Sequence, residues 1–281
     1  MKIGFIHPGA MGISLAVSAQ VTGHEACWVP TDRSPETINR AQEYGLTEFQ
    51  SLAELCEECS IIISVCPPHA ALDVAQQVLD ASFQGIYADA NAIAPEKTRS
   101  MEQMMCVPGI EFVDGGIIGG PAWQPESTWL YLSGPQANQV SDCFSEGLIE
   151  TELLGNEIGK ASAIKMCFAA YTKGITALLC AIMAAADDLG VRSELEQQWS
   201  KNGSDFAERT RNRITRVTAK AWRFSGEMKE IAATLESTGL PPEFHLAASD
   251  IYRRISKFKG AEPTPSIEEV LAALKSGNQD L

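Results

Sequence analysis

Residues 3–12, with the sequence IGFIHPGAMG, constrain the fold of this chain more than any other segment. The apolar residues 3–6 predict a buried first strand, and residues 10–21 predict a helix directly after a tight turn. Such a turn brings free backbone N–H groups to the positive end of a helix dipole, where the pyrophosphate of a dinucleotide binds. The segment therefore favours a strand–turn–helix dinucleotide site, although an ordinary turn with two glycines has the same appearance.

The fingerprint of this turn is incomplete. The usual pattern is G-x-G-x-x-G, whereas this chain has His7 at the first glycine position and retains only Gly9 and Gly12. Gly9 lies where the backbone must approach the phosphates, and Gly12 lies where the helix must pack closely on the strand. We therefore predict a cofactor-binding turn made of Pro8, Gly9, Ala10, Met11 and Gly12.

Composition limits the class of protein. The 281 residues suffice for two domains, and the net charge of −14 argues against nucleic acid or an anionic membrane as the main partner. The cysteines lie mostly in apolar stretches and no signal peptide is recognised, so we expect a cytoplasmic protein with free thiols. We expect no metal site: Cys56 and Cys59 have CxxC spacing without a second pair, and are interpreted as helix surface.

The order of apolar patterns indicates an α/β fold. The first half alternates short apolar runs with helical patterns, which predicts a Rossmann-type doubly wound parallel sheet. Residues 111–114 predict a strand that ends in a glycine-rich loop, 115–120. The second half is helical throughout, beginning with one long alanine-rich helix over 160–189. We expect an NAD(P)-binding Rossmann domain, 1–157, joined by this helix to an all-helical substrate and dimerisation domain, 158–281.

The loop after the second strand bears on the choice of cofactor. An arginine there binds a 2′-phosphate, whereas an acid binds a ribose diol. Arg33 and Ser34 suit a phosphate, and Asp32 opposes one only if it points inward. NADP is therefore favoured, with NAD possible. The alternative is a surface loop in which Ser34 caps the following helix.

Further candidates follow the ends of other predicted strands, where ligands of open α/β sheets bind. Cys66 and Pro67 follow one strand and Asn91 follows another, so all three are predicted to contact the cofactor. Asn91 is equally suited to a turn. Gly119 and Gly120 are predicted to bind substrate, because exposed N–H groups at glycines converge on small anions. A bulge or tight bend is the alternative.

Lys165 is the candidate catalytic residue. It interrupts an otherwise apolar stretch near the start of the long helix. A lysine on such a face finds a partner, extends its ammonium to water, or loses its proton easily enough to serve as a general acid or base. Lys173, two turns later, makes the second of these interpretations reasonable.

Several ordered segments resemble the β-hydroxyacid dehydrogenase and 6-phosphogluconate dehydrogenase superfamily. The matching segments are 4–6 with 9–12, 65–68, 89–95, 114–120, and Gly159 with Lys165. Residues 114–121, 171–174 and 239–245 resemble more closely a branch with a distinct phosphogluconate-dehydrogenase-type helical C-terminal domain. The resemblance implies a Rossmann domain, a long interdomain helix, a catalytic role for Lys165 and a homodimer whose helical domains complete each other's active sites.

The chain also departs from the pattern of that superfamily. The substrate-loop serine falls on Ile118, and the asparagine after the catalytic lysine falls on Phe168 or Ala169. His245 is a candidate substrate contact, and a packing histidine is the alternative. Glu227 is interpreted as part of a solvated helix face, and a contact with substrate is the alternative.

The resulting hypothesis is an NAD(P)-dependent oxidoreductase that transfers hydride between nicotinamide and a small hydroxy or carbonyl substrate. Loss of the serine and the asparagine motivates one alternative, an imine reductase or reductive aminase. The incomplete fingerprint and Ile118 motivate another, a non-catalytic dinucleotide-binding sensor.

Overall fold

The computed structural model describes residues 1–276 and divides the chain into two compact units, Met1–Met166 and Cys167–Leu281. The first unit contains one sheet with the strand order β3-β2-β1-β4-β5-β6-β7-β8. Strands β1 to β6 are parallel, β7 is antiparallel to β6, and β8 is parallel to β7. The strands are β1 (Lys2–Phe5), β2 (Glu25–Trp28), β3 (Thr47–Glu48), β4 (Ile61–Ser64), β5 (Gly85–Asp89), β6 (Ile110–Gly119), β7 (Thr128–Ser133) and β8 (Glu150–Leu153). The predicted Rossmann-type fold is confirmed.

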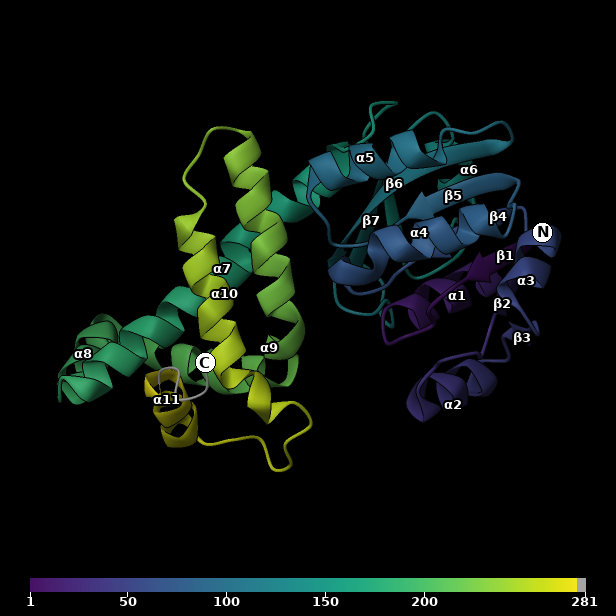
Figure 1. The fold of residues 1–281 in the computed structure, drawn as a ribbon. Coiled ribbons are helices and arrows are strands. Elements are labelled where there is room, and N and C mark those ends of the chain that lie inside the picture. Colours follow the sequence, from purple (N-terminus) through teal and green to yellow (C-terminus); the bar gives the residue numbers. More distant parts are fainter. Residues whose placement is uncertain (277–281) are drawn as a thin grey trace. The chain divides into compact units, whose positions relative to one another are not determined.

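Helices cover both faces of this sheet, because side chains of successive strand residues point to opposite faces. Ile61 and Ile63 pack in one core with residues of the helices α1, α2 and α6, whereas Ile62 packs in the other with residues of α4 and α5. The helices of this unit, labelled in Figure 1, are α1 (Gly12–Val21), α2 (Pro35–Glu43), α3 (Leu52–Glu58), α4 (Ala71–Asp80), α5 (Pro95–Met105) and α6 (Ala137–Asp142). The nearly continuous apolar sequence of β4 thus reflects burial on both faces.

Two expectations need correction. The predicted glycine-rich loop 115–120 is mostly strand, because β6 continues to Gly119 and pairs with β7. The missing side chains let neighbouring backbone approach this strand, so the glycines mark close packing instead of a loop. Cys56 and Cys59, expected on a helix surface, are each 3% exposed and pack in the cores of the first unit.

The long helix α7 (Lys160–Asp188) begins in the first unit and continues into the second. It is the one described helix whose length and composition would allow it to cross a membrane, a criterion that core helices of water-soluble domains also meet. The second unit is helical, as predicted, and its α9 and α10 run side by side (Figure 1). Its other helices are α8 (Arg192–Trp199), α9 (Phe206–Ser237), α10 (Glu243–Ile255) and α11 (Ile267–Lys275).

Candidate dinucleotide and proton-transfer site

The β1–α1 turn presents an open helix N-terminus at the carboxyl edge of the sheet. No side chain caps α1, and its first turn contains no acidic residue. Among the described residues, no acceptor is found for the backbone N–H groups of Ala10 and Met11. A β-carbon on Gly12 would lie 2.3 Å from the carbonyl oxygen of His7, so this position requires glycine. The turn therefore has the donors and the space that a pyrophosphate needs.

The β2–α2 loop brings Arg33 toward this turn. Burial lowers the pKa of His7, and the guanidinium of Arg33 lies close enough to the imidazole that its charge lowers this pKa further. Asp32 adopts a left-handed conformation, with φ of 59°, and is exposed. Ser34 caps α2 by accepting a hydrogen bond from the Thr37 N–H at 3.4 Å. Arg33 thus lies over the strand ends, while Ser34 holds the start of the next helix.

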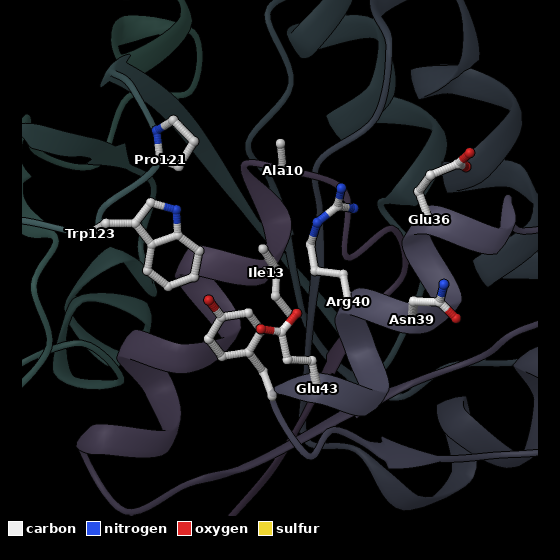
Figure 2. A pocket seen from close by; sticks show the side chains of 9 residues that line it. Ala10, Ile13, Glu36, Asn39, Arg40, Glu43, Pro121 and Trp123 are labelled. Carbon is white, nitrogen blue, oxygen red and sulfur yellow. The ribbon is translucent and has the colours of Figure 1, made fainter.

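A cavity of about 320 Å³ opens beside the turn (Figure 2). Arg40 from α2 points into it, and its Nη1 also donates to the carbonyl oxygen of Pro8 at 3.5 Å. At the other side, Trp123 stacks on Tyr44 with ring centroids 5.2 Å apart. Arg40 was not among the predicted cofactor residues, although its place on the amphipathic helix that directly follows the Arg33 loop was a usable signal.

The predicted cofactor residue Asn91 is 2% exposed and joins two strand ends. Its Oδ1 accepts from the Cys66 N–H at 2.5 Å, and its Nδ2 donates to Ser64 Oγ at 3.1 Å and to Asp89 Oδ1 at 2.5 Å. Burial raises the pKa of Asp89 to about 7, and burial raises the pKa of the Cys66 thiol to about 12. The amide therefore fixes the turn that leads into Pro67.

Asp114 fixes the start of α7. Its carboxylate accepts from the Gly159 N–H at 2.9 Å, from the Ser162 N–H at 3.1 Å and from Ser162 Oγ at 2.6 Å, and it also accepts from Ser133 Oγ at 3.0 Å. Burial raises the pKa of Asp114, while these hydrogen bonds oppose the rise. A carboxylate at a helix N-terminus is stabilised by free N–H groups and by the helix dipole.

Lys165 follows one turn later and lies against β6. A β-carbon on Gly116 would lie 2.3 Å from the carbonyl oxygen of Ala161 and 3.1 Å from Lys165 Cβ. The Lys165 side chain is partly buried. Contacts of Asp114 and Gly116 with the first turns of α7 therefore determine the position of Lys165 relative to β6.

The predicted substrate residues Gly119 and Gly120 lie at the end of β6. Gly119 has φ of 121°, a conformation that favours glycine, and is exposed, as is Gly120. Thr128 Oγ1 donates to the Gly120 carbonyl oxygen at 2.7 Å, which fixes the backbone there. Ile118, which stands where the superfamily has a serine, is 8% exposed. In the sheet it pairs with Trp129 of the neighbouring strand β7.

Within the second unit, a buried charge pair that the sequence did not indicate joins α7 to α9. Lys173 pairs with Glu227 of α9, and the side chains are 16% and 9% exposed. The interpretation of Glu227 as a solvated residue is therefore wrong. The pairing could not be predicted from a local pattern, because Glu227 lies 54 positions after Lys173 in the sequence.

His245 lies nearby in the same unit. It is 6% exposed, with Nε2 3.4 Å from the Ala170 carbonyl oxygen and Nδ1 without a partner among the described residues. Gly174 makes room for its ring, because a β-carbon there would lie 3.1 Å from Nε2. The histidine is thus packed closely on α7.

The open β1–α1 turn at the carboxyl edge of a parallel sheet defines a Rossmann-type dinucleotide-binding protein. Residues 2–144 match the family model described as the NAD binding domain of 6-phosphogluconate dehydrogenase, and the chain belongs to this family. Residues 186–255 match a domain of unknown function, DUF1932. The superfamily resemblance inferred from the sequence is confirmed.

Solved structures agree with this assignment. A conserved protein of unknown function, described as structurally similar to 3-hydroxyacid dehydrogenases, is 30% identical, with a TM-score of 0.66 over 93% of this chain and 100% of that chain. The 3-hydroxyisobutyrate dehydrogenase of Mycobacterium tuberculosis shares the fold at 17% identity, with a TM-score of 0.69 over 98% and 99%. A reductive aminase of Aspergillus terreus in complex with NADPH does so at 16% identity, with a TM-score of 0.55 over 96% and 98%.

Proposed function

We propose that this dehydrogenase-type protein is an NADP-dependent oxidoreductase that transfers hydride between nicotinamide C4 and a small hydroxyl or carbonyl substrate. The observation that carries the proposal is the position of Lys165 on α7 against β6, which depends on the close approach at Gly116 and on the hydrogen bonds of Asp114. The amine and the dinucleotide turn belong to the same compact unit. The bound nicotinamide would supply or accept the hydride.

The proposed cofactor residues fall into two groups. The turn residues Pro8, Gly9, Ala10, Met11 and Gly12 would hold the pyrophosphate, with Cys66 and Pro67 at the adjacent strand end. Arg33 favours NADP, because its guanidinium lies over the strand ends while Asp32 is exposed. NAD is the competing cofactor. Asn91 would act through the Cys66 backbone that it holds.

The residues proposed for the substrate are Gly119, Gly120 and His245. Exposed backbone at the two glycines would bind a small anionic group, such as a carboxylate. Lys165 would take the hydroxyl proton during oxidation and return it during reduction.

An imine reductase or reductive aminase activity is a second candidate. Ile118, near the end of β6, stands where the superfamily has a serine, and the loss of that hydroxyl contact favours a less polar substrate. The similarity to a reductive aminase concerns the fold, so the choice depends on activity measurements. A non-catalytic dinucleotide sensor is the third candidate, because His7 interrupts the fingerprint.

We also propose a cytoplasmic homodimer of two domains, 1–157 for the cofactor and 158–281 for substrate and dimerisation. The net charge of −14 disfavours binding to nucleic acid or to anionic membranes. Sedimentation of the full chain at several concentrations tests the dimer.

Lys165→Met tests the proposed chemistry. Wild-type protein is assayed with NADPH and NADH against panels of hydroxyacids, carbonyl compounds and carbonyl–amine mixtures. We expect the variant to lose turnover and to retain cofactor affinity, since methionine is unbranched like lysine and lacks the terminal amine. Turnover equal to that of the wild type would exclude the role of Lys165. Failure of the wild type to bind either cofactor would exclude all three candidate functions.

A further inference from the structure

Two buried nitrogen atoms beside the β1–α1 turn have no hydrogen-bond partner among the described residues. They are His7 Nδ1 and Arg33 Nε, and they follow the neighbouring strands β1 and β2. Burying a polar atom without a partner destabilises a fold, so such atoms need an explanation. His7 belongs to the turn that leads into α1, whose N-terminus no side chain caps, and the charge of Arg33 reaches its imidazole.

The charges around His7 favour an anion. Arg33 is the charged group whose field reaches the imidazole, and Arg40 donates to the carbonyl oxygen of the next residue, Pro8. The Cys66 thiol has a pKa of about 12 and is uncharged at neutral pH. The carboxylate of Asp32 is exposed on its loop, and Asp89 is buried beneath Cys66, where it is held by Asn91.

We propose that His7 is a ligand of the cofactor pyrophosphate, occupying the position of the missing fingerprint glycine, and that it takes up a proton when the dinucleotide binds. His7 lies in the turn itself, two residues before Gly9, whereas Arg33 comes from the loop that is suited to the ribose. The proposal rests on the dinucleotide of the proposed function and is independent of Lys165.

The linkage follows from the surroundings of the imidazole. Burial and then the charge of Arg33 lower the pKa of His7 to about 4, so the ring is neutral in the free protein at neutral pH. A bound phosphate opposes both causes and raises the pKa of His7. The cofactor then binds more tightly as the pH falls, about tenfold for each unit by which it raises this pKa.

The test follows the imidazole directly. The C–H resonances of His7, assigned by their loss in His7→Gln, are titrated by NMR in free protein and in protein saturated with NADP⁺ or NAD⁺, whichever binds. We expect the pKa of His7 to rise by at least about one unit with the cofactor bound. An unchanged or lowered pKa would overturn the proposal, while cofactor binding itself would leave the proposed function intact.

Calorimetry separates the pyrophosphate from the 2′-phosphate of NADP⁺, which itself titrates at about pH 6. Binding is measured at a pH between the two pKa values of His7 that NMR gives for the free and the cofactor-bound protein, because the imidazole takes up a proton only in that interval. The buffers differ in ionisation enthalpy, and the ligands are NADP⁺ and ADP-ribose, which carries the pyrophosphate without the 2′-phosphate. Proton uptake that occurs with both ligands and is lost in His7→Gln supports the assignment. Uptake with NADP⁺ alone, or uptake that persists in His7→Gln, rejects it. His24→Gln, altered before β2 at the opposite strand end, is the matched control and should behave as the wild type.

Discussion

Gly116 and Lys165 are separated by 49 positions in the sequence, yet a β-carbon on Gly116 would lie 3.1 Å from Lys165 Cβ. The same β-carbon would lie 2.3 Å from the carbonyl oxygen of Ala161. The helix that carries the proposed catalytic amine therefore rests on bare backbone of β6. The glycine-rich end of β6 therefore provides the surface on which the first turns of α7 pack.

Gly116→Ala should shift α7 and with it the amine. The new methyl group collides with backbone, which cannot move as a flexible side chain can, so we expect a loss of about 1–3 kcal/mol in the free energy of unfolding and a lower kcat. Urea unfolding and steady-state kinetics measure the two effects. Gly226→Ala is the matched control, because open space surrounds this helical glycine; it should gain about 0.5–1 kcal/mol. A Gly116→Ala protein as stable and active as the wild type would contradict the close packing.

Asp114→Asn should weaken the start of α7. The amide offers one acceptor oxygen in place of two, so buried donors of Gly159 and Ser162 lose partners. We expect destabilisation by about 1–3 kcal/mol and a fall in kcat that exceeds any change in KM for the cofactor. Ser162→Ala, which keeps both backbone donors, should have a smaller effect. If kcat is unchanged while stability falls, Asp114 does not position Lys165.

The buried carboxyl group of Asp89 should make stability fall as the pH rises. Its pKa is about 7 in the folded protein, above the ordinary value of 3.8, because burial disfavours the charge. The folded state therefore binds more protons than the unfolded state between about pH 4 and pH 7, and the contribution of Asp89 is lost across that interval.

Asp89→Asn isolates this effect, since asparagine keeps the shape and an acceptor for Asn91. The free energy of unfolding of the variant, relative to the wild type, should increase between pH 4 and pH 8. Urea unfolding at several pH values measures the difference. A difference independent of pH would show that Asp89 titrates normally.

Removing one charge of the Lys173–Glu227 pair should destabilise the protein more than removing both. Glu227→Gln leaves the Lys173 ammonium in a buried environment and should cost about 3–5 kcal/mol, whereas Lys173→Met with Glu227→Leu should recover much of the loss. Phe224, whose ring centroid lies 4.5 Å from Lys173 Nζ, remains in both proteins. A double-mutant cycle made of Lys173→Met, Glu227→Leu and the two together gives the coupling energy, and a value near zero would contradict the burial of the pair.

Local patterns in the sequence were sufficient for most of the fold. The apolar residues 3–6 predicted β1, the alternation of apolar runs with helical patterns predicted the parallel sheet, and the apolar stretch from residue 160 predicted α7. The short strand β3 and the weakly patterned β8 were not predicted. A strand of two residues carries no period, and three of the four residues of β8 are polar.

The candidate site could be predicted only in part. Arg33, Lys165 and the β1–α1 turn follow from residue type and from order along the chain. The orphaned nitrogen of His7, the cap that Asp114 provides and the burial of Glu227 depend on partners that are distant in the sequence. Such pairings leave no local periodicity to detect.

The sequence by itself determined the strand–turn–helix at the N-terminus, the parallel sheet and the helical second half, because hydrophobic periodicity and glycine positions act over a few neighbouring residues. Only the tertiary structure decided that the glycines after Asp114 extend a strand, and that this strand sets the position of Lys165. Close packing of backbone and burial of side chains depend on which segments meet in space. Neither segment alone contains that information, because the contact needs residues from both.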